Sequence, residues 1–385
     1  MSPRNDRRAA RPRTLQTSAL LAVILATSAC QKPEAADAPA SAATPDTASA
    51  QRESQTRPAS SLPAGEVVYV SNEDSNDLTV ISAVDNQVIE TIEVGTRPRG
   101  VKVSPDGGTV FVALSGSPKC PPTMPDEECE KLVADKSLDG IAEIDAATRT
   151  VKRILPGGSD PEQFDVLWQK GKLFVSNEDA NQATIVDVAS GAIEHTIDVG
   201  REPEGVRLTP DGTLCYVTGE TDHDVTVIDT SSGTIVAKIS VGMRPRDAVF
   251  LSDGKRAYVS SELGASVAVV DVGANAVAGT IEMPKESKPM GLAVSPDDQR
   301  LYVATGRGKN VVVIDTKTNA ITQSVEVGPR PWGIALTRDG KRLYSANGPS
   351  GDVTVLDTET LTVVTRVPAG KSPWGVAVGP APAMR

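Results

Sequence analysis

The stretch Pro373-Trp374-Gly375-Val376-Ala377-Val378 is the last patterned segment of this chain, and the strand expected after it lies at the other end. Elsewhere the same phrase is followed by a turn and a strand of the type Tyr-Val-Ser-Asn. The first patterned segment is such a strand, Val68-Tyr69-Val70-Ser71-Asn72. One repeat is therefore split between the two ends, which closes a ring of short β-repeats without a free edge strand. The sequence predicts an all-β propeller of four-stranded antiparallel blades, in which the C-terminal strand pairs with the N-terminal strands.

Two landmarks count the blades. Strands ending in Asp recur at steps of 42, 42, 42, 44 and 42 residues, at Asp145, Asp187, Asp229, Asp271, Asp315 and Asp357. An earlier copy, Leu78–Ile81, is followed by Ser82. An x-Pro-x element also occurs seven times, at Pro98, Pro161, Pro203, Pro245, Pro289, Pro331 and Pro373. Both landmarks predict seven blades.

Local patterns define the strands and turns within each repeat. Short β-branched runs such as Val225–Ile228 are bounded by turn residues, as strands are. Between the first two strands lies Ser104-Pro105-Asp106-Gly107 or a relative of it. Pro fixes φ, Asp accepts hydrogen bonds from its own turn and Gly tolerates positive φ. We therefore interpret the repeated Asp residues as structural.

Composition limits the classes of function. Aromatic residues make up 3% of the chain, so we expect Val, Ile, Leu and Ala to build the core. The formal net charge is −11 and there is no basic stripe, so no nucleic-acid partner is expected.

The N-terminal segments predict export. Residues 1–29 have the arginine-rich start and short apolar stretch of a signal peptide. Thr27-Ser28-Ala29-Cys30 resembles a bacterial lipobox, which would make Cys30 a lipidation site; an ordinary signal peptide cut nearby is the alternative. Residues 30–64 predict a disordered tether, and 65–380 the propeller, with an inserted loop at 114–140. The expected location is periplasmic, lipid-anchored and at the outer membrane.

The other cysteines are assigned by context. Cys120 and Cys129 lie nine residues apart in the inserted loop, and in an oxidising compartment they are predicted to form a disulfide. Cys215 lies in a strand and is predicted to be a buried small hydrophobe. No Cys/His cluster has zinc spacing, so no metal site is expected.

One face of the ring is predicted to carry the binding residues. The x-Pro-x elements connect the fourth strand of one blade to the first strand of the next, so they surround one mouth. The second-to-third connections, with Glu73, Glu178, Glu220 and Glu262, lie on the same face. The predicted ligand- or partner-binding residues are Arg97, Arg99, Asp160, Glu162, Glu202, Glu204, Arg244, Arg246, Arg330, Trp332 and Trp374.

These residues allow two interpretations. A polarised mouth with two aromatic faces suits an anionic or zwitterionic planar ligand, or a charged loop of a partner protein. Alternatively, the charges pair from blade to blade and the Trp side chains serve packing. His223, in a second-to-third loop near carboxylates, is a candidate general base or metal ligand, or a solvated loop residue. His195 is expected to be exposed.

Several phrases resemble known propeller proteins. Tyr69-Val70-Ser71-Asn72 and Gly95-Thr96-Arg97-Pro98-Arg99-Gly100 resemble YVTN-type β-propeller repeat proteins, over residues 66–379. The order of Asp160-Pro161-Glu162-Gln163-Phe164, Glu202-Pro203-Glu204-Gly205 and Pro373-Trp374-Gly375 is similar to the PQQ-dependent catabolism-associated β-propeller family. That resemblance implies an exported propeller linked to quinone-dependent alcohol oxidation. No cofactor is expected in this chain, because the quinoprotein dehydrogenases themselves have eight blades and many more tryptophans.

The sequence leads to a first hypothesis and an alternative. The first is a membrane-tethered binding or scaffold protein, more a binder than an enzyme, accessory to PQQ-dependent alcohol oxidation. Its partner would be a protein or a small anionic ligand. The alternative is a lactonase-like hydrolase or lyase with its site on the same propeller face. Binding of peptidoglycan or another surface polymer is a third hypothesis.

Overall fold

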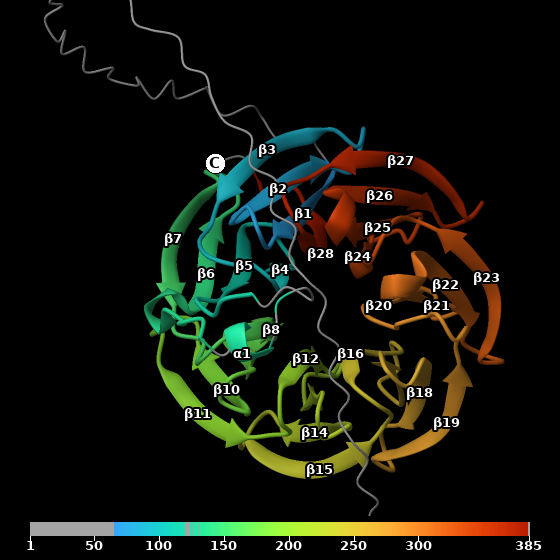
Figure 1. Ribbon diagram of the computed structural model, residues 1–385, viewed down its shortest axis with the longest axis horizontal. Helices are drawn as coiled ribbons and strands as arrows, with labels where there is room; N and C mark the ends of the chain where they lie inside the picture. Colours follow the sequence, from blue (N-terminus) through green and yellow to red (C-terminus); the bar gives the residue numbers. More distant parts are fainter. Residues whose placement is uncertain (1–64, 120–123, 125, 130, 384–385) are drawn as a thin grey trace, which may run out of the picture. The chain divides into compact units, whose positions relative to one another are not determined.

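The described part of the chain forms a closed ring of seven blades around a central axis (Figure 1). The computed structural model describes residues 65–119, 124, 126–129 and 131–383. Strand β28 (Pro373–Pro380) pairs antiparallel with β1 (Glu66–Asn72), with Val378 opposite Val68 and Ala377 opposite Tyr69. The predicted closure between the two ends of the chain is therefore confirmed, together with the all-β class and the number of blades.

Each blade is a four-stranded antiparallel sheet whose order follows the sequence from the channel outward, except that β28 is the innermost strand of blade 1. Blade 1 consists of β28, β1, β2 (Asp77–Ser82) and β3 (Val88–Glu93), and blade 2 of β4 (Val101–Val103), β5 (Thr109–Leu114), β6 (Gly140–Asp145) and β7 (Thr150–Leu155). Blade 3 consists of β8 (Pro161–Leu167), β9 (Lys172–Asn177), β10 (Gln182–Asp187) and β11 (Ile193–Asp198), and blade 4 of β12 (Pro203–Leu208), β13 (Leu214–Gly219), β14 (Asp224–Asp229) and β15 (Thr234–Ser240). Blade 5 consists of β16 (Pro245–Phe250), β17 (Arg256–Ser261), β18 (Ser266–Asp271) and β19 (Ala276–Glu282), and blade 6 of β20 (Leu292–Val294), β21 (Arg300–Ala304), β22 (Asn310–Asp315) and β23 (Ala320–Glu326). Blade 7 consists of β24 (Pro331–Leu336), β25 (Arg342–Asn347), β26 (Asp352–Asp357) and β27 (Thr362–Pro368).

The core lies between adjacent blades. It is mainly aliphatic, as expected, but the second strand of every blade also carries one large buried aromatic side chain, which the composition did not indicate. Each of these rings packs against the next blade around the ring; they are Tyr69, Phe111, Phe174, Tyr216, Tyr258, Tyr302 and Tyr344. Tyr344 of blade 7 packs against Val68 and Val70 of blade 1, so the same contact completes the circle.

The inner strands of the repeat carry a glycine because these strands are crowded together near the axis. A Cβ atom at Gly333 would lie 2.5 Å from the carbonyl oxygen of Trp374, and one at Gly375 would lie 2.5 Å from that of Arg99. The Ser of the Tyr-Val-Ser-Asn motif also joins adjacent blades. Ser71 Oγ donates to the Arg99 carbonyl oxygen at 2.5 Å, across to the next inner strand. The glycine of the inner strand and the serine of the Tyr-Val-Ser-Asn motif therefore both serve the contact between adjacent blades.

The repeated aspartates are structural, as predicted. Asp145 accepts hydrogen bonds from the backbone N–H groups of Ala147 and Thr148 after its strand, and Asp106 accepts from Gly108 in the turn between the first two strands. These are the bonds that fix tight turns.

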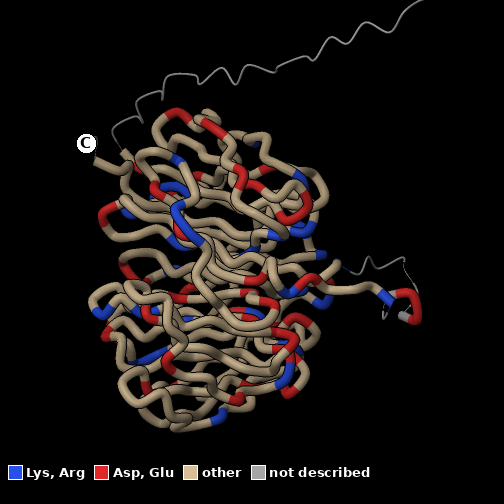
Figure 2. The backbone as a smooth tube through the Cα atoms, turned by 90° about the vertical axis from the view of Figure 1, so that its left-hand side faces the viewer, with Lys and Arg blue, Asp and Glu red and all other residues tan. Residues whose placement is uncertain are grey.

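Helical segments are short in the described part of the chain. They are α1 (Asp126–Cys129) and the 3-10 turns η1 (Lys136–Leu138), η2 (Trp168–Lys170), η3 (Gly306–Gly308) and η4 (Gly348–Ser350). None of these helices has the length and apolar character needed to cross a membrane. The connection between β5 and β6 contains α1 and η1 and projects from one face of the ring, at the right of Figure 2. The predicted signal peptide, lipidation site Cys30 and tether lie outside the described residues, as do Cys120 and the side chain of Cys129, so the predicted disulfide stays a prediction.

Candidate active site at the mouth of the propeller

A cavity of about 710 Å³ occupies the mouth on the face that carries the x-Pro-x elements. It collects most of the residues predicted from the sequence, and acidic residues of the second-to-third connections join them. Its charged and aromatic lining consists of Glu73, Arg97, Arg99, Lys119, Asp160, Glu162, Glu178, Asp179, Glu220, Arg244, Arg246, Glu262, Arg307, Arg330, Trp332 and Trp374. Glu202 and Glu204 do not line it: Glu202 is exposed and accepts a hydrogen bond from Thr221, whereas Glu204 lies deeper, in the channel.

The backbone before each proline helps to form the mouth. Arg97, Asp160, Arg244 and Arg330 all precede a proline and have φ between 45° and 59°. This left-handed conformation is uncommon for residues other than glycine. Its recurrence from blade to blade makes it a property of the repeat.

The first of two buried charge clusters surrounds Arg99. Its guanidinium group contacts Asp160, Glu162 and Glu178, the last at 3.3 Å, and its side chain is only 3% exposed. Burial raises the pKa of Glu162 well above its usual range and that of Asp160 above its own, although Arg99 opposes both shifts. Burial would also raise the pKa of Glu178, but its hydrogen bond with Glu162 and the charge of Arg99 lower it to about 2. Glu162 and Glu178 therefore form a hydrogen-bonded pair whose pKa values are shifted in opposite directions.

The second cluster, around Arg246, repeats this arrangement. Arg246 contacts Glu204 and Glu220 of blade 4 and Glu262 of its own blade. Burial raises the pKa of Glu204 well above its usual range despite the nearby charge of Arg246. Burial would raise the pKa of Glu262 as well, but Arg246 and Arg244 lower it. Two buried arginines thus each hold three carboxyl groups, all of which line the mouth except Glu204, which lies in the channel below it.

Many predicted binding residues are engaged in contacts between blades. Arg99 of blade 2 contacts carboxylates of blade 3, and Arg246 of blade 5 contacts those of blade 4. Arg97 forms an ion pair with Glu73 of blade 1 at 3.0 Å. The charges therefore pair from blade to blade, which was the alternative interpretation of the sequence.

The remaining part of the mouth is aromatic and cationic. Trp332 and Trp374 lie with ring centroids 5.5 Å apart, and the guanidinium of Arg330 lies 4.7 Å from the Trp332 ring. Arg246 contacts the same ring at 5.5 Å, so these neighbours occupy much of the Trp332 surface. Burial lowers the pKa of Arg330, and the nearby positive charges of Arg246 and Arg307 add to this, while Glu262 opposes it.

Arg330 and Arg307 differ from the other mouth arginines. Neither forms an ion pair with any residue that the structure describes, and both line the cavity. Guanidinium groups of this kind beside an aromatic wall are the side chains with which proteins commonly bind anionic groups.

His223 has a structural explanation. Its Nδ1 lies 3.2 Å from the backbone N–H of Arg244. In other blades the side-chain oxygen of Asn76 or Asn181 accepts the corresponding N–H group. His223 therefore occupies the position of a turn asparagine and does not line the mouth cavity. His195 is exposed on an outer strand, as expected.

No group of three or more His, Cys, Asp or Glu side chains in the described residues is arranged to hold a metal ion. Cys215 is buried, as predicted, and burial raises the pKa of its thiol well above the usual range.

A second charged layer lies deeper in the channel and was not predicted from the sequence. Lys102 lies 3.5 Å from Asp165, and Arg207 lies 3.0 Å from Asp247. A signal was present: three of these residues stand four positions after their proline, where other blades have Ala or Val.

The fold and the comparisons define the class of protein: it is a seven-bladed β-propeller protein. Residues 234–363, about a third of the chain, match the family described as "Lactonase, 7-bladed beta-propeller". The matched segment contains Arg244, Arg246, Glu262, Arg330 and Trp332 of the mouth. Among curated proteins, none matches this chain.

Solved structures share the fold at low sequence identity. Hydrazine synthase of Kuenenia stuttgartiensis is 23% identical with a TM-score of 0.62, over 74% of this chain and 90% of that one. A putative 6-phosphogluconolactonase of Bacteroides fragilis is 15% identical (TM-score 0.66; 83% and 99% covered). One from Bacteroides uniformis is 14% identical (TM-score 0.67; 82% and 100% covered).

The first functional hypothesis from the sequence is wrong. It assigned a tethered binding or scaffold role in PQQ-dependent alcohol oxidation, whereas the family match is to lactonase propellers. The alternative, a lactonase-like enzyme with its site on the same face, is the better supported of the two. The repeat phrases misled because they describe blade-to-blade packing, which propellers of different function share.

Proposed function

We propose that the protein is a lactonase-like hydrolase that opens the ring ester of a small anionic lactone in the mouth cavity. The match of residues 234–363 to the lactonase family carries this proposal. The names of two structural neighbours, both putative 6-phosphogluconolactonases, agree with it. The finer resemblance to YVTN-type repeat proteins stays a prediction.

The Glu162–Glu178 pair is the proposed acid–base unit. Glu178 is the more accessible member, with a side chain 34% exposed, and it is ionised at neutral pH. Glu162 retains a proton because burial raises its pKa. Two adjacent carboxyl groups that share one proton can act as base and acid in the same reaction.

The proton balance of the reaction can be written for this pair. Water attacks the lactone carbonyl carbon and transfers a proton to Glu178, which gives a tetrahedral oxyanion. The ring C–O bond then breaks, and the leaving alkoxide takes the proton of Glu162. Proton transfer from Glu178 to Glu162 through their hydrogen bond restores the starting state, and the product is a hydroxy acid.

Arg330 and Arg307 are the proposed anion subsite. Their unpaired guanidinium groups suit a phosphate or carboxylate substituent of the lactone. Contact with Trp332 holds the guanidinium of Arg330 at the wall of the cavity, which limits the entropy lost when an anion binds.

Hydrolysis of 6-phosphogluconolactone and of uncharged glucono-δ-lactone tests the proposal, with acid release followed in a pH-stat against the spontaneous rate. We expect Glu178→Gln to lower kcat about 100-fold. Arg330→Gln should raise KM for the phosphorylated lactone about tenfold and leave KM for the uncharged one nearly unchanged. Glu194→Gln, on an outer strand, is the control and should behave as wild type. Rates no faster than the spontaneous reaction for both lactones would refute the proposal.

A further inference from the structure

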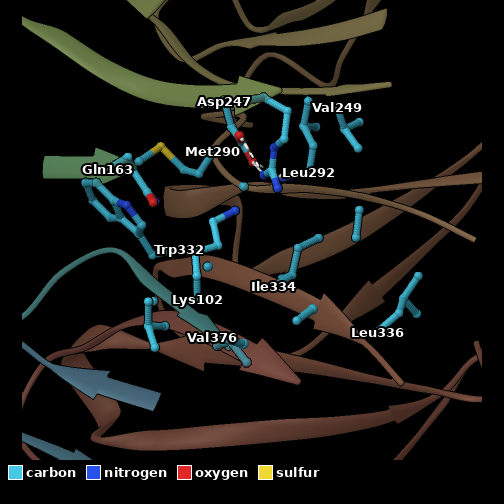
Figure 3. Close-up of a pocket in the computed structure, with 18 of the residues that line it drawn as sticks. Lys102, Gln163, Asp247, Val249, Met290, Leu292, Trp332, Ile334, Leu336 and Val376 are labelled. Carbon is cyan, nitrogen blue, oxygen red and sulfur yellow. Dashed lines mark hydrogen bonds and ion pairs between the residues drawn. The ribbon is translucent and has the colours of Figure 1, made fainter. Parts of the chain in front are cut away.

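A second cavity lies in the central channel, directly next to the mouth cavity. Its volume is about 330 Å³, and the two cavities share Arg246 and Trp332 in their walls. Figure 3 shows Trp332 and Gln163 toward one end, Lys102 and Asp247 in the middle and Leu336 toward the other end. A cavity of this size is at the small end of the range for ligand sites.

The cavity exists because one side of the channel is built from small residues. The inner strands of blades 6, 7 and 1 present Gly291, Ala293, Gly333, Ala335, Gly375 and Ala377 to it. The inner strands of blades 2 to 5 present Lys102, Gln163, Arg207 and Asp247 instead. The remaining lining is largely aliphatic, with Leu292, Val294, Ile334, Leu336 and Val378. The cavity therefore has a polar wall formed by blades 2 to 5 and an apolar wall formed by blades 6, 7 and 1.

Most polar groups on the polar wall are already bonded. Arg207 donates to both oxygens of Asp247, at 3.0 and 3.3 Å, and to the carbonyl oxygen of Ala248. Asp247 also accepts from the backbone N–H groups of Ala248 and Leu292. Both carboxylate oxygens of Asp247 are therefore occupied, and the pair joins neighbouring inner strands.

Lys102 and Gln163 are different. Among the described residues, Lys102 forms an ion pair with Asp165 alone, at 3.5 Å, and Asp165 itself accepts from the backbone N–H groups of Val166 and Leu208. The side-chain amide of Gln163 makes no hydrogen bond with any residue in the described parts of the chain. Donor hydrogens on both side chains therefore remain available to a ligand in the cavity.

The charge of the site favours an anion. The charged side chains that line the channel cavity are Lys102, Arg207 and Arg246 against Glu204 and Asp247. Among these lining side chains, three are cations and two carry carboxyl groups, and burial raises the pKa of one of the two, Glu204, well above its usual range. Burial and the charge of Arg207 lower the pKa of Lys102, although Asp165 and Asp247 oppose the shift.

We propose that the channel cavity is a second binding site, for a short-chain aliphatic carboxylate. Lys102 and Gln163 bind the carboxylate, and the alkyl chain lies against the Gly, Ala and aliphatic wall. At about 30 Å³ for each water-sized group, 330 Å³ holds on the order of ten such groups, which fits a chain of six to eight carbons. The site does not depend on the lactonase proposal, because it is assigned from the channel residues alone.

Isothermal titration of the purified protein with butanoate, hexanoate and octanoate tests this site, with 1-hexanol as the uncharged comparison. We expect Kd to fall about fourfold for each added methylene until the cavity is full. Lys102→Met should weaken hexanoate binding about tenfold or more, and hexanol should bind the wild type correspondingly weakly.

Two further variants separate this site from the mouth and from a folding defect. Ala335→Leu keeps every charge but fills the cavity with a larger side chain, so this variant should not bind octanoate. Arg330→Gln alters the mouth and should leave hexanoate binding as in wild type. The proposal is overturned if no carboxylate binds, if Ala335→Leu and Lys102→Met both bind as wild type, or if Arg330→Gln is the variant that loses binding.

Discussion

Replacing Arg99 by methionine should destabilise the protein by about 3–5 kcal/mol at pH 7, because it leaves the buried carboxyl groups around it without a positive charge. Arg99 is 3% exposed and contacts three acidic side chains, so water cannot take its place. The loss should shrink as the pH falls. Without Arg99, the folded-state pKa values of Asp160, Glu162 and Glu178 rise above their unfolded values, so the penalty is present at high pH and is relieved as these groups gain protons.

Urea unfolding followed by tryptophan fluorescence at pH 7 and pH 5 measures this effect. Adding Glu162→Gln to the Arg99→Met variant should recover part of the loss, since one buried carboxyl group becomes neutral. Arg366→Met is the control: Arg366 is 43% exposed and lies 3.8 Å from Asp352, so its loss should amount to less than about 1 kcal/mol. A change below about 1 kcal/mol for Arg99→Met, or one independent of pH, would refute the view that buried pairing joins these blades.

Three other predictions concern single positions. Gly333→Ala should destabilise the protein by about 1–3 kcal/mol in urea unfolding, because its Cβ would lie 2.5 Å from a carbonyl oxygen of the next blade, whereas Gly279→Ala meets no atom within 4 Å and should be close to neutral. His223→Asn should retain both stability and any lactonase activity, whereas His223→Ala should lose about 1 kcal/mol; a loss of activity in the asparagine variant would show that the histidine is catalytic. Glu178 has a folded pKa of about 2, below its ordinary value of 4.5, so the stability it contributes is present above about pH 4.5 and is lost as the pH falls toward 2. The stability difference between wild type and Glu178→Gln should therefore shrink over that range, and a constant difference would contradict the assignment.

Repetition makes much of this fold accessible from the sequence alone. The spacing of strands ending in Asp and of x-Pro-x elements gives the number of blades, because each repeat is one sheet that can bury its faces only against its neighbours. The split repeat gives the closure, since a strand without its partner at one end can pair only with the other end. Topology then places the proline-containing connections at one mouth, which is why most predicted residues line a single cavity.

The tertiary structure decided what those residues do. From the sequence, Arg99 and Glu162 are charged loop residues. In the ring they are buried partners from different blades, and burial raises the pKa of Glu162 well above its usual range. Arg330 has the same pattern around it in the sequence but forms no ion pair with the residues that the structure describes, although Glu262 and Glu73 lie near enough to act on its pKa. The channel cavity depends on which small and charged inner-strand residues face one another across the axis. Arg99 and Glu162 lie 63 positions apart in the sequence, and local sequence patterns carry no information about burial across that distance.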